Sequence, residues 1–209
     1  VYVSNASKKD HEQAGYAQDK GFLIPNGFDT REFMPDRDIR ADMREQLRIP
    51  PDTFVIGLVA RWHQEKDHAN FFSAAGILAR RKANVKFVLC GENVTSDNFE
   101  LMKMIESNCV RSKTHLLGLR RDIKQIMLML DVNTLSSYAE SFPMVVGEAM
   151  ASGIPCVVTD VGECANMVGE TGRVVPHSNP EALAAAWQEI LELPESTRQE
   201  LGRQAQERI

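Results

Sequence analysis

The sequence predicts an α/β domain built on a doubly wound parallel sheet. From residue 53 onward, short β-branched apolar runs alternate with segments whose apolar residues recur at helical spacing. Five or six such strand–helix pairs follow one another with short links. This alternation is typical of a parallel sheet that carries helices on both faces.

Each strand is predicted from an apolar, β-branched run, and each helix from apolar residues at helical spacing or from its end signals. The helix at 68–82 is indicated by apolar spacing from Phe71 to Ala79, and the helix at 143–152 by Pro143 in its first turn and Gly153 just past its end. Apolar, β-branched runs predict strands at 53–60, 85–90, 114–118, 132–136, 154–159 and 173–175. Helices are expected between and after them, at 68–82, 97–111, 121–130, 143–152, 179–192 and 195–208.

The first 52 residues are less regular. Residues 1–22 predict one strand and one polar helix that stops at Gly21, and Pro25-Asn26-Gly27 is a turn signal. A charged segment, 36–52, predicts a short helix that breaks at Pro50-Pro51. The opening Val-Tyr-Val-Ser resembles a strand rather than a signal peptide, so we interpret the chain as a fragment of a longer protein.

The composition excludes several classes of protein. The chain has 43% hydrophobic and 25% charged residues, as ordinary soluble proteins do, and its net charge of −5 offers no basic footprint for nucleic acid. The apolar runs are strand-sized, so no transmembrane segment is predicted. Four cysteines without a CxxC pair and five scattered histidines favour a reduced, cytoplasmic protein without a structural metal.

Charged residues follow the predicted strands at one edge of the sheet, where ligands bind in doubly wound folds. Arg61 and Lys66 follow the strand at 53–60, and two cations on one loop suit a diphosphate, Arg as a planar fork and Lys as a point charge. An exposed loop rich in Lys and Glu is the plainer explanation and stays open.

Two carboxylates, Glu140 and Glu148, flank the start of the helix at 143–152. The N-terminus of this helix attracts anions, and an acid beside it suits a neutral hydroxyl, so a sugar attached to a diphosphate offers both kinds of group. Glu148 lies among apolar neighbours and needs partners, which ribose hydroxyls would provide. A helix cap and a solvated helix face remain the alternative roles.

Two further loops lie on the same edge. Backbone groups near Gly118 and Leu119 could bind a nucleobase edge, with Arg120 stacking on it or covering it. For Arg120 taken alone, an exposed side chain in an ordinary turn is the plainer explanation. The chain has no GxGxxG after a strand, no GxxxxGK[ST] and no Gly-x-Ser-x-Gly, which removes the main support for dinucleotide oxidoreductases, NTPases and α/β hydrolases.

Taken in order, these motifs resemble those of one family. Ile24-Pro-Asn-Gly-Phe-Asp29, Arg61 with Lys66, the Gly118 turn, Asp131, Glu140 through Pro155 and Thr159-Asp-Val-Gly162 span nearly the whole chain. They resemble the C-terminal domain of a retaining nucleotide-sugar glycosyltransferase of the GT-B fold, in the group 1 family typified by bacterial enzymes of polysaccharide biosynthesis. The Glu-x7-Glu element followed by Ala-Met-Ala-Ser-Gly-Ile-Pro is its most specific part.

The resemblance implies a role for each position. Arg61 and Lys66 would hold the donor diphosphate and stabilise the charge of the leaving group, Glu140 would contact the donor sugar, and Glu148 the ribose. Backbone N–H groups from about Phe142 to Val146 would meet phosphate or sugar oxygens. The donor-binding positions would be Ser141, Phe142, Pro143, Met144 and Val145, with Gly118, Leu119 and Arg120 near the base. The resemblance implies a hexosyltransferase that works by front-face substitution with retention and requires no metal or other cofactor.

The sequence departs from the family pattern at three places. Gly162-Glu163 stands where two glycines are usual, Asp67 where a Gly commonly follows the Lys, and Cys90-Gly91-Glu92 where a Gly-rich turn is common. None of these changes removes a charged role. They leave the identity of the donor sugar open.

The resemblance also implies that half of the enzyme is missing. Residues 1–22 would be the tail of the N-terminal domain, 23–52 the interdomain linker with the helix that leads into the sheet, and 53–209 the nucleotide-sugar-binding domain without its closing C-terminal crossover helix. A glycan or lipid-linked acceptor would bind the missing domain. The fragment alone would bind donor but turn over little, and the whole enzyme would be cytoplasmic or peripheral to the inner face of the membrane.

Three alternatives remain open at this point. A nucleotide-sugar epimerase of the same fold would share the nucleotide cleft, a non-catalytic module would bind nucleotide-sugar without transferring it, and an unrelated doubly wound domain would bind another ligand. The Glu-x7-Glu element together with Arg61 and Lys66 favours transfer.

Overall fold

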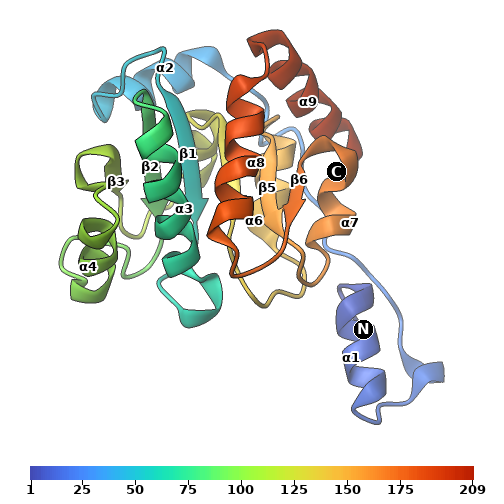
Figure 1. Cartoon of the computed structure of the whole chain (residues 1–209). Helices are drawn as coiled ribbons and strands as arrows, with labels where there is room; N and C mark the ends of the chain where they lie inside the picture. The colour runs from blue at the N-terminus through green and yellow to red at the C-terminus, as the bar shows by residue number, and fades with distance from the viewer.

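A six-stranded, entirely parallel sheet forms the centre of the molecule, as the computed structural model of residues 1–209 shows (Figure 1). Its strands are β1 (Phe54–Val59), β2 (Val85–Cys90), β3 (Thr114–Leu116), β4 (Val132–Leu135), β5 (Cys156–Thr159) and β6 (Arg173–Val175). The strand order is β3-β2-β1-β4-β5-β6. The order reverses between β1 and β4, and in such sheets the ligand crevice lies at the carboxyl ends of the strands beside this switch point.

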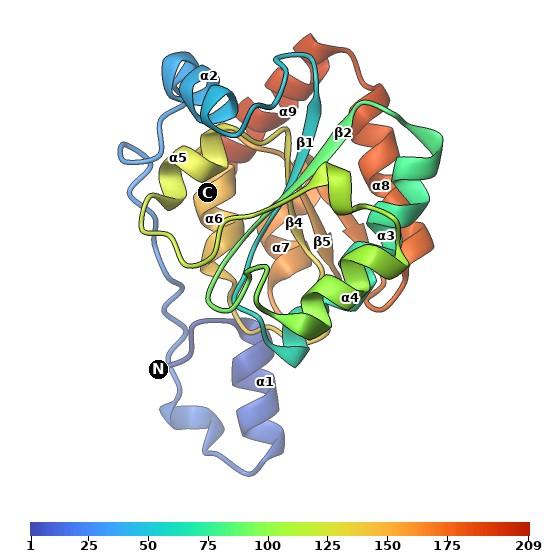
Figure 2. The ribbon, with the colours of Figure 1, turned by 90° about the vertical axis from the view of Figure 1, so that its left-hand side faces the viewer.

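Helices cover both faces of the sheet, which confirms the predicted fold class (Figure 2). The helices are α1 (Asn5–Gln13), α2 (Arg37–Gln46), α3 (His68–Arg81), α4 (Phe99–Ser107), α5 (Ile123–Leu128), α6 (Met144–Ala151), α7 (Cys164–Val168), α8 (Pro180–Glu192) and α9 (Glu195–Arg208). None of them combines the length and apolar character that a bilayer-spanning helix requires.

The alternation of side chains along the strands divides the core into two layers. Phe54, Ile56 and Leu58 of β1 pack with α3, α4 and α8 on one face, whereas Val55 of the same strand packs with α5, α6 and α7 on the other. Because successive side chains of a strand point to opposite faces, a strand that is apolar throughout must be covered twice. Helices α2 and α9 complete the second layer through Met43 and Ala205.

Several predicted boundaries differ from the structure. The strand predicted at 114–118 ends at Leu116, since Gly118 has a positive φ of 64° and turns the chain. The helices predicted at 97–111 and 121–130 are shorter, at Phe99–Ser107 and Ile123–Leu128. Helix α7 was missed because five residues are too few to display a helical period.

Residues 1–35, which we call the amino-terminal arm, lie outside the two layers, although Phe28 packs against the second one. The strand predicted at its start is wrong, because Tyr2 forms only an isolated bridge with Leu23. The predicted polar helix is present as α1, below the carboxyl ends of the strands in Figure 1, whereas α2 and α9 lie above the opposite ends. The sheet therefore has a carboxyl edge beside α1 and an amino edge beside α2 and α9.

Candidate functional site

Two loops meet at the carboxyl edge and bring an acid and a base together. The β1–α3 loop, residues 60–67, carries Lys66, and the β4–α6 loop, residues 136–143, carries Glu140. The Lys66 Nζ lies 2.5 Å from Glu140 Oε1, with both side chains largely buried. Because β1 and β4 are neighbours at the switch point, residues 74 positions apart in the chain become partners.

Adjacent serines at the end of β4 hold the two members of this pair. The Ser137 hydroxyl donates to Glu140 Oε1 at 2.7 Å, and the Ser136 hydroxyl donates to the backbone carbonyl of Lys66 at 2.8 Å. Both serines are fully buried. The Thr159 hydroxyl on β5 in turn donates to the carbonyl of Ser137 at 2.5 Å. The sequence analysis did not identify these hydroxyls, although their position directly after a buried strand was a usable signal.

The N-terminus of α6 is open and faces this loop. Pro143 is the N-cap residue, and no side chain caps the helix, so Glu140 is not the helix cap that the sequence also allowed. The N–H groups of Phe142, Met144 and Val145 make no hydrogen bond within the chain, whereas that of Val146 is bonded to the Pro143 carbonyl. Unsatisfied N–H groups at a helix start attract oxyanions. Ser141 is exposed beside them.

Glu148 lies one turn further along α6. Its side chain is half-buried, and its carboxylate makes neither a hydrogen bond nor an ion pair. Burial raises the pKa of Glu148 above its ordinary value, because desolvation penalises the charged form. A carboxylate in this condition gains from any ligand that donates hydroxyl hydrogen bonds to it.

Arg61 is exposed, and its guanidinium makes no hydrogen bond or ion pair within the chain. It follows β1 on the same loop as Lys66, so the structure places it at the carboxyl edge without pairing it. Asp67, which departs from the family pattern, adopts the left-handed conformation with φ 45°. A Gly would adopt this conformation freely, and Asp compensates by accepting the Asn70 N–H as the N-cap of α3.

Beneath Lys66 lies a buried polar group that the sequence analysis did not single out. His68 is 3% exposed, neither of its ring nitrogens has a partner, and its ring lies 4.9 Å from that of Trp62. Burial, with a smaller contribution from the charge of Lys66, lowers the pKa of His68 to about 4. His68 is therefore neutral at pH 7 and adds no charge beside Lys66. The side chain of Asn70 is also buried without a partner.

The loop after β3 contains the residues predicted near the base. Gly118 is buried and its N–H donates to the Val94 carbonyl, while Leu119 is 75% exposed. Arg120 is bound to Asp122 of its own loop, with Nε donating to Oδ1 at 2.7 Å. This ion pair raises the pKa of Arg120 and lowers that of Asp122. The loop thus offers an exposed apolar side chain and a guanidinium that is already oriented.

Gly162 packs directly against the loop that carries Glu140. Its φ is 55°, and a Cβ at this position would lie 2.3 Å from the Glu140 carbonyl oxygen. Only glycine allows this approach, so the β5–α7 loop, residues 160–163, and the β4–α6 loop form one continuous wall. The replacement of the usual second glycine by Glu163 leaves this contact intact.

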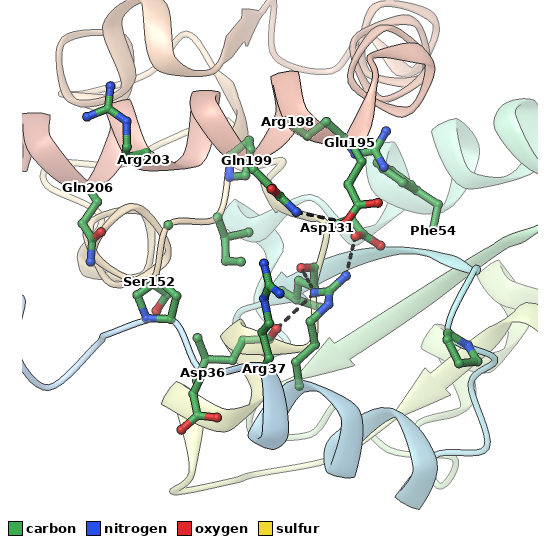
Figure 3. A pocket seen from close by; sticks show the side chains of 18 of the residues that line it. Asp36, Arg37, Phe54, Asp131, Ser152, Glu195, Arg198, Gln199, Arg203 and Gln206 are labelled. Atoms are coloured by element: carbon green, nitrogen blue, oxygen red, sulfur yellow. Dashed lines mark hydrogen bonds and ion pairs between the residues drawn. The ribbon is translucent and has the colours of Figure 1, made fainter.

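The amino edge carries a different cluster, around Asp131. Asp131, which is labelled in Figure 3, pairs with Arg40 at 2.6 Å and with Arg44 at 2.8 Å, and it accepts the Val55 N–H at 2.7 Å. Arg44 also donates to the carbonyls of Met129 and Thr53. Asp131 matches the family pattern, yet it lies at the opposite edge from Lys66 and connects α2 to the sheet.

A groove of about 840 Å³ lies above this cluster, between α2 and α9. Arg37 of α2 and Gln199, Arg203 and Gln206 of α9 line it (Figure 3). Arg203 is itself paired with Glu200 and Glu207, whereas Arg37 and Arg198, which make no ion pair, share the groove with the carboxylates of Asp36 and Glu195. The open helix start, Glu148 and Arg61 at the carboxyl edge are better candidates for a charged ligand.

The protein contains no group of three or more His, Cys, Asp or Glu side chains that could hold a metal ion. All four cysteines are free, and Cys90, Cys156 and Cys164 are buried as small apolar side chains. Burial raises the pKa of the Cys90 thiol to about 11 and those of Cys156 and Cys164 to about 12. These thiols are therefore protonated and unreactive at neutral pH.

Comparison with known proteins decides the family. The model of the family "Glycosyl transferases group 1" matches residues 39–208. The chain belongs to the group 1 glycosyltransferases. Among curated relatives of this glycosyltransferase chain is the UDP-Gal:alpha-D-GlcNAc-diphosphoundecaprenol alpha-1,3-galactosyltransferase of Escherichia coli, 29% identical over 142 residues, which are 66% of this chain and 36% of that protein.

Solved structures agree on the GT-B fold. The UDP complex of HepE from Anabaena superposes with a TM-score of 0.89 at 25% identity, over 99% of this chain and 57% of that one. The C-terminal domain of the group 1 protein LpcC from Francisella tularensis matches with a TM-score of 0.75 at 21% identity, over 87% of this chain and 95% of that domain. The glycosyltransferase chain spans between about a third and a half of the curated relatives it matches, in agreement with a C-terminal domain.

Proposed function

We propose that the chain is the donor-binding domain of a retaining hexosyltransferase that moves a sugar from a nucleoside diphosphate to a glycan or lipid-linked acceptor. The observation that carries this proposal is the Lys66–Glu140 pair beside the open N-terminus of α6. One cation, one carboxylate and free N–H groups at a single edge match the phosphates and hydroxyls of a sugar nucleotide.

The diphosphate would lie between the α6 N-terminus and the cations. The free N–H groups of Met144 and Val145 would donate to phosphate oxygens, and Arg61 and Lys66 would contribute positive charge. Lys66 would partly exchange its contact with Glu140 for the phosphate. When the glycosidic bond breaks, negative charge grows on the nucleoside diphosphate, and fixed cations and dipoles stabilise that charge without reorganising.

The donor sugar and the ribose of the nucleoside would each bind to one of the two carboxylates. Glu140 would accept hydrogen bonds from sugar hydroxyls, with Ser137 fixing its orientation, and Glu148 would accept them from the ribose. The base would lie against Leu119 and the backbone of Gly118, with Arg120 beside it. Ser141, Phe142 and Pro143 would form the wall between sugar and phosphate. The reaction would need no metal or other cofactor.

The division of the chain would follow the same scheme. Residues 1–22 would belong to the end of an N-terminal domain, 23–52 to the linker and the helix that leads into the sheet, and 53–209 to the donor domain. The acceptor would bind outside the 209 residues, so transfer would require the remaining part of the protein. The whole enzyme would act in the cytoplasm or at the inner membrane face.

Titration calorimetry of this chain with UDP, GDP and ADP tests the proposal. UDP is the first choice, because the E. coli relative is named for a UDP-sugar donor and the HepE structure is a UDP complex. We expect one nucleotide to bind and Lys66→Ala to weaken it between about 10-fold and 100-fold, the effect of losing a charge-assisted hydrogen bond.

Lys103→Ala is the matched control, because Lys103 is an exposed lysine on α4 that makes no hydrogen bond or ion pair. It should bind as the wild type does. Failure of all three nucleotides to bind, or equal binding by the Lys66 and Lys103 variants, would contradict the proposed site.

A further inference from the structure

Glu163 is a buried carboxylate with no part in the scheme above. It ends the β5–α7 loop and is 8% exposed, so its charge must be compensated by partners. The N–H of Asn5 donates to Oε2 at 3.1 Å, and the Asn166 amide donates to Oε1 at 2.9 Å. Asn5 lies 158 positions away in the sequence, on the amino-terminal arm.

The contact falls on the first turn of α1. Ser4 is the N-cap residue of α1 and Asn5 its first helical residue, and the first turn contains no acidic side chain of its own. Glu163 therefore supplies the negative charge that the positive end of the helix favours. The Ser4 Oγ accepts the Ser7 N–H, and it shares a hydrogen bond of 3.2 Å with the Ser141 Oγ, in which either hydroxyl can donate.

On its other side, Glu163 is attached to the residues that follow Glu140. The Glu163 N–H donates to the Ser141 carbonyl at 3.1 Å, and the preceding Gly162 packs on the Glu140 carbonyl. One residue thus connects the start of α1 to the backbone of the β4–α6 loop. Figure 1 shows α1 projecting from the sheet at this edge.

The arm makes a second contact, with helix α6, which follows the β4–α6 loop. Phe28 lies against Gly147 of α6, where a Cβ would come within 2.0 Å of its ring, and it stacks on Phe142 at 6.3 Å. The arm therefore touches the segment from Ser141 to Gly147 at both ends. This segment includes the open helix start and adjoins Glu148.

We infer that Glu163 is a positioning residue, which fastens the amino-terminal arm to the β4–α6 loop and thereby orders Glu140. The inference rests on the proposed function only for the role of Glu140 toward the donor sugar. A displacement of α1 is transmitted through the Asn5 N–H and Glu163 to Ser141, the residue next to Glu140. The arm is then part of the donor site and more than a connector.

The position of Asn5 allows a selective test. Proline is well accepted as the first residue of a helix and lacks an N–H, and the residue before it must be extended, as Ser4 is with φ −147° and ψ 155°. Asn5→Pro therefore deletes the hydrogen bond to Glu163 and keeps α1. Asn5→Ala is the matched control, because it retains the N–H and loses only the 3.5 Å side-chain contact.

Hydrogen exchange of the Tyr138, Val146 and Glu163 amides measures the order of the loop in the absence of ligand, because these N–H groups donate to the carbonyls of Glu65, Pro143 and Ser141. We expect Asn5→Pro to accelerate exchange there by about tenfold, the factor that corresponds to one hydrogen bond to a charged group, and Asn5→Ala to leave it unchanged. Affinity for UDP-glucose should fall by a similar factor, while the unfolding midpoint of the sheet domain stays constant. In a Glu163→Ala background, Asn5→Pro should add nothing.

Equal exchange in the Asn5→Pro and Asn5→Ala chains would overturn the inference, and so would an undiminished effect of Asn5→Pro in the Glu163→Ala background. A wild-type chain that binds neither UDP nor UDP-glucose would count against the proposed donor site. The exchange rates would still decide whether Glu163 orders the loop, so the two failures are distinguishable.

Discussion

Asp131 and Glu148 are both partly buried carboxylates on the same sheet domain, one at each edge, and their surroundings are opposite. Asp131 accepts hydrogen bonds from two arginines and a backbone N–H at the amino edge. Glu148 has no partner at the carboxyl edge, and Arg61 and both ring nitrogens of His68, which follow β1 at the same edge, are also unpaired. Charges that a protein satisfies internally stabilise its fold, whereas charges it leaves unsatisfied are available to a ligand.

The contrast holds for helix ends as well. At the amino edge, Arg40 and Arg44 donate to the carbonyls of Leu128, Met129 and Leu130, which end helix α5 and its turn. At the carboxyl edge, the start of α6 is left without a cap. A helix end whose carbonyls are hydrogen-bonded by arginine side chains offers no binding site. The two edges therefore differ in function because the backbone groups at the helix ends are hydrogen-bonded at one edge and free at the other.

The largest effect should come from breaking the satisfied edge. Asp131→Asn leaves Arg44, which is 5% exposed, without its anionic partner. We expect the free energy of unfolding to fall by about 3–5 kcal/mol, as for other buried ion pairs that lose one member. Urea denaturation measures the loss. Asp29→Asn removes an exposed partner of Arg31 and should leave the midpoint unchanged; equal effects of the two variants would contradict the assignment.

A second prediction concerns the cost of an unsatisfied group. Burial lowers the pKa of His68 from 6.5 to about 4, so between these values the unfolded chain binds the proton and the folded chain does not. Stability should therefore fall as the pH drops through this window, with His68 contributing about 3 kcal/mol of the loss. In His68→Phe, the free energy of unfolding, measured by denaturation between pH 7 and pH 4, should decline less than in the wild type. His177→Phe changes an exposed histidine and is the control, and its decline should match that of the wild type.

These residues also show what the sequence can reveal. A parallel sheet places the carboxyl ends of its strands at one edge, so the location of Lys66, Glu140 and Glu148 followed from the alternation of elements alone. The contact between Lys66 and Glu140 did not follow, because it depends on how two loops pair. The Tyr138 N–H donates to the Glu65 carbonyl and aligns them, and no local pattern encodes such a bond.

The role of Asp131 was hidden for a related reason. The sequence analysis gave Asp131 only as a match to the family pattern, without a role. A residue just before a strand lies at the amino edge, away from Lys66 and Glu140. The Ser136–Ser137 pair and His68 were missed because small hydroxyls and a lone histidine have no characteristic spacing. Position after a strand was the signal available for the serines, and burial, which decides the state of His68, is visible only in the fold.

The third prediction uses Glu148 to sharpen the contrast. Burial raises the pKa of Glu148, and ribose hydroxyls donate to its ionised form, so binding should release a proton. Affinity should therefore weaken as the pH falls below the raised pKa, by up to tenfold per pH unit. UDP-glucose is the suitable probe, because its diphosphate diester stays fully charged at mildly acidic pH. In Glu148→Gln this dependence should vanish, and an unchanged pH profile would remove Glu148 from the ligand site.

The smallest effects should come from two glycines that share a conformation but lie at opposite edges. Gly153, with φ 71°, lines the amino-edge groove, where a Cβ would lie 3.3 Å from the Pro35 side chain. Gly162, with φ 55°, lies against the Glu140 carbonyl at 2.3 Å. Each alanine substitution costs about 1–2 kcal/mol of backbone strain. Only Gly162→Ala must also displace the loop that carries Glu140, so calorimetry should show weaker UDP-glucose binding for Gly162→Ala and wild-type binding for Gly153→Ala. Equal affinities would mean that Glu140 tolerates movement of its loop, which would contradict its assignment to the donor sugar.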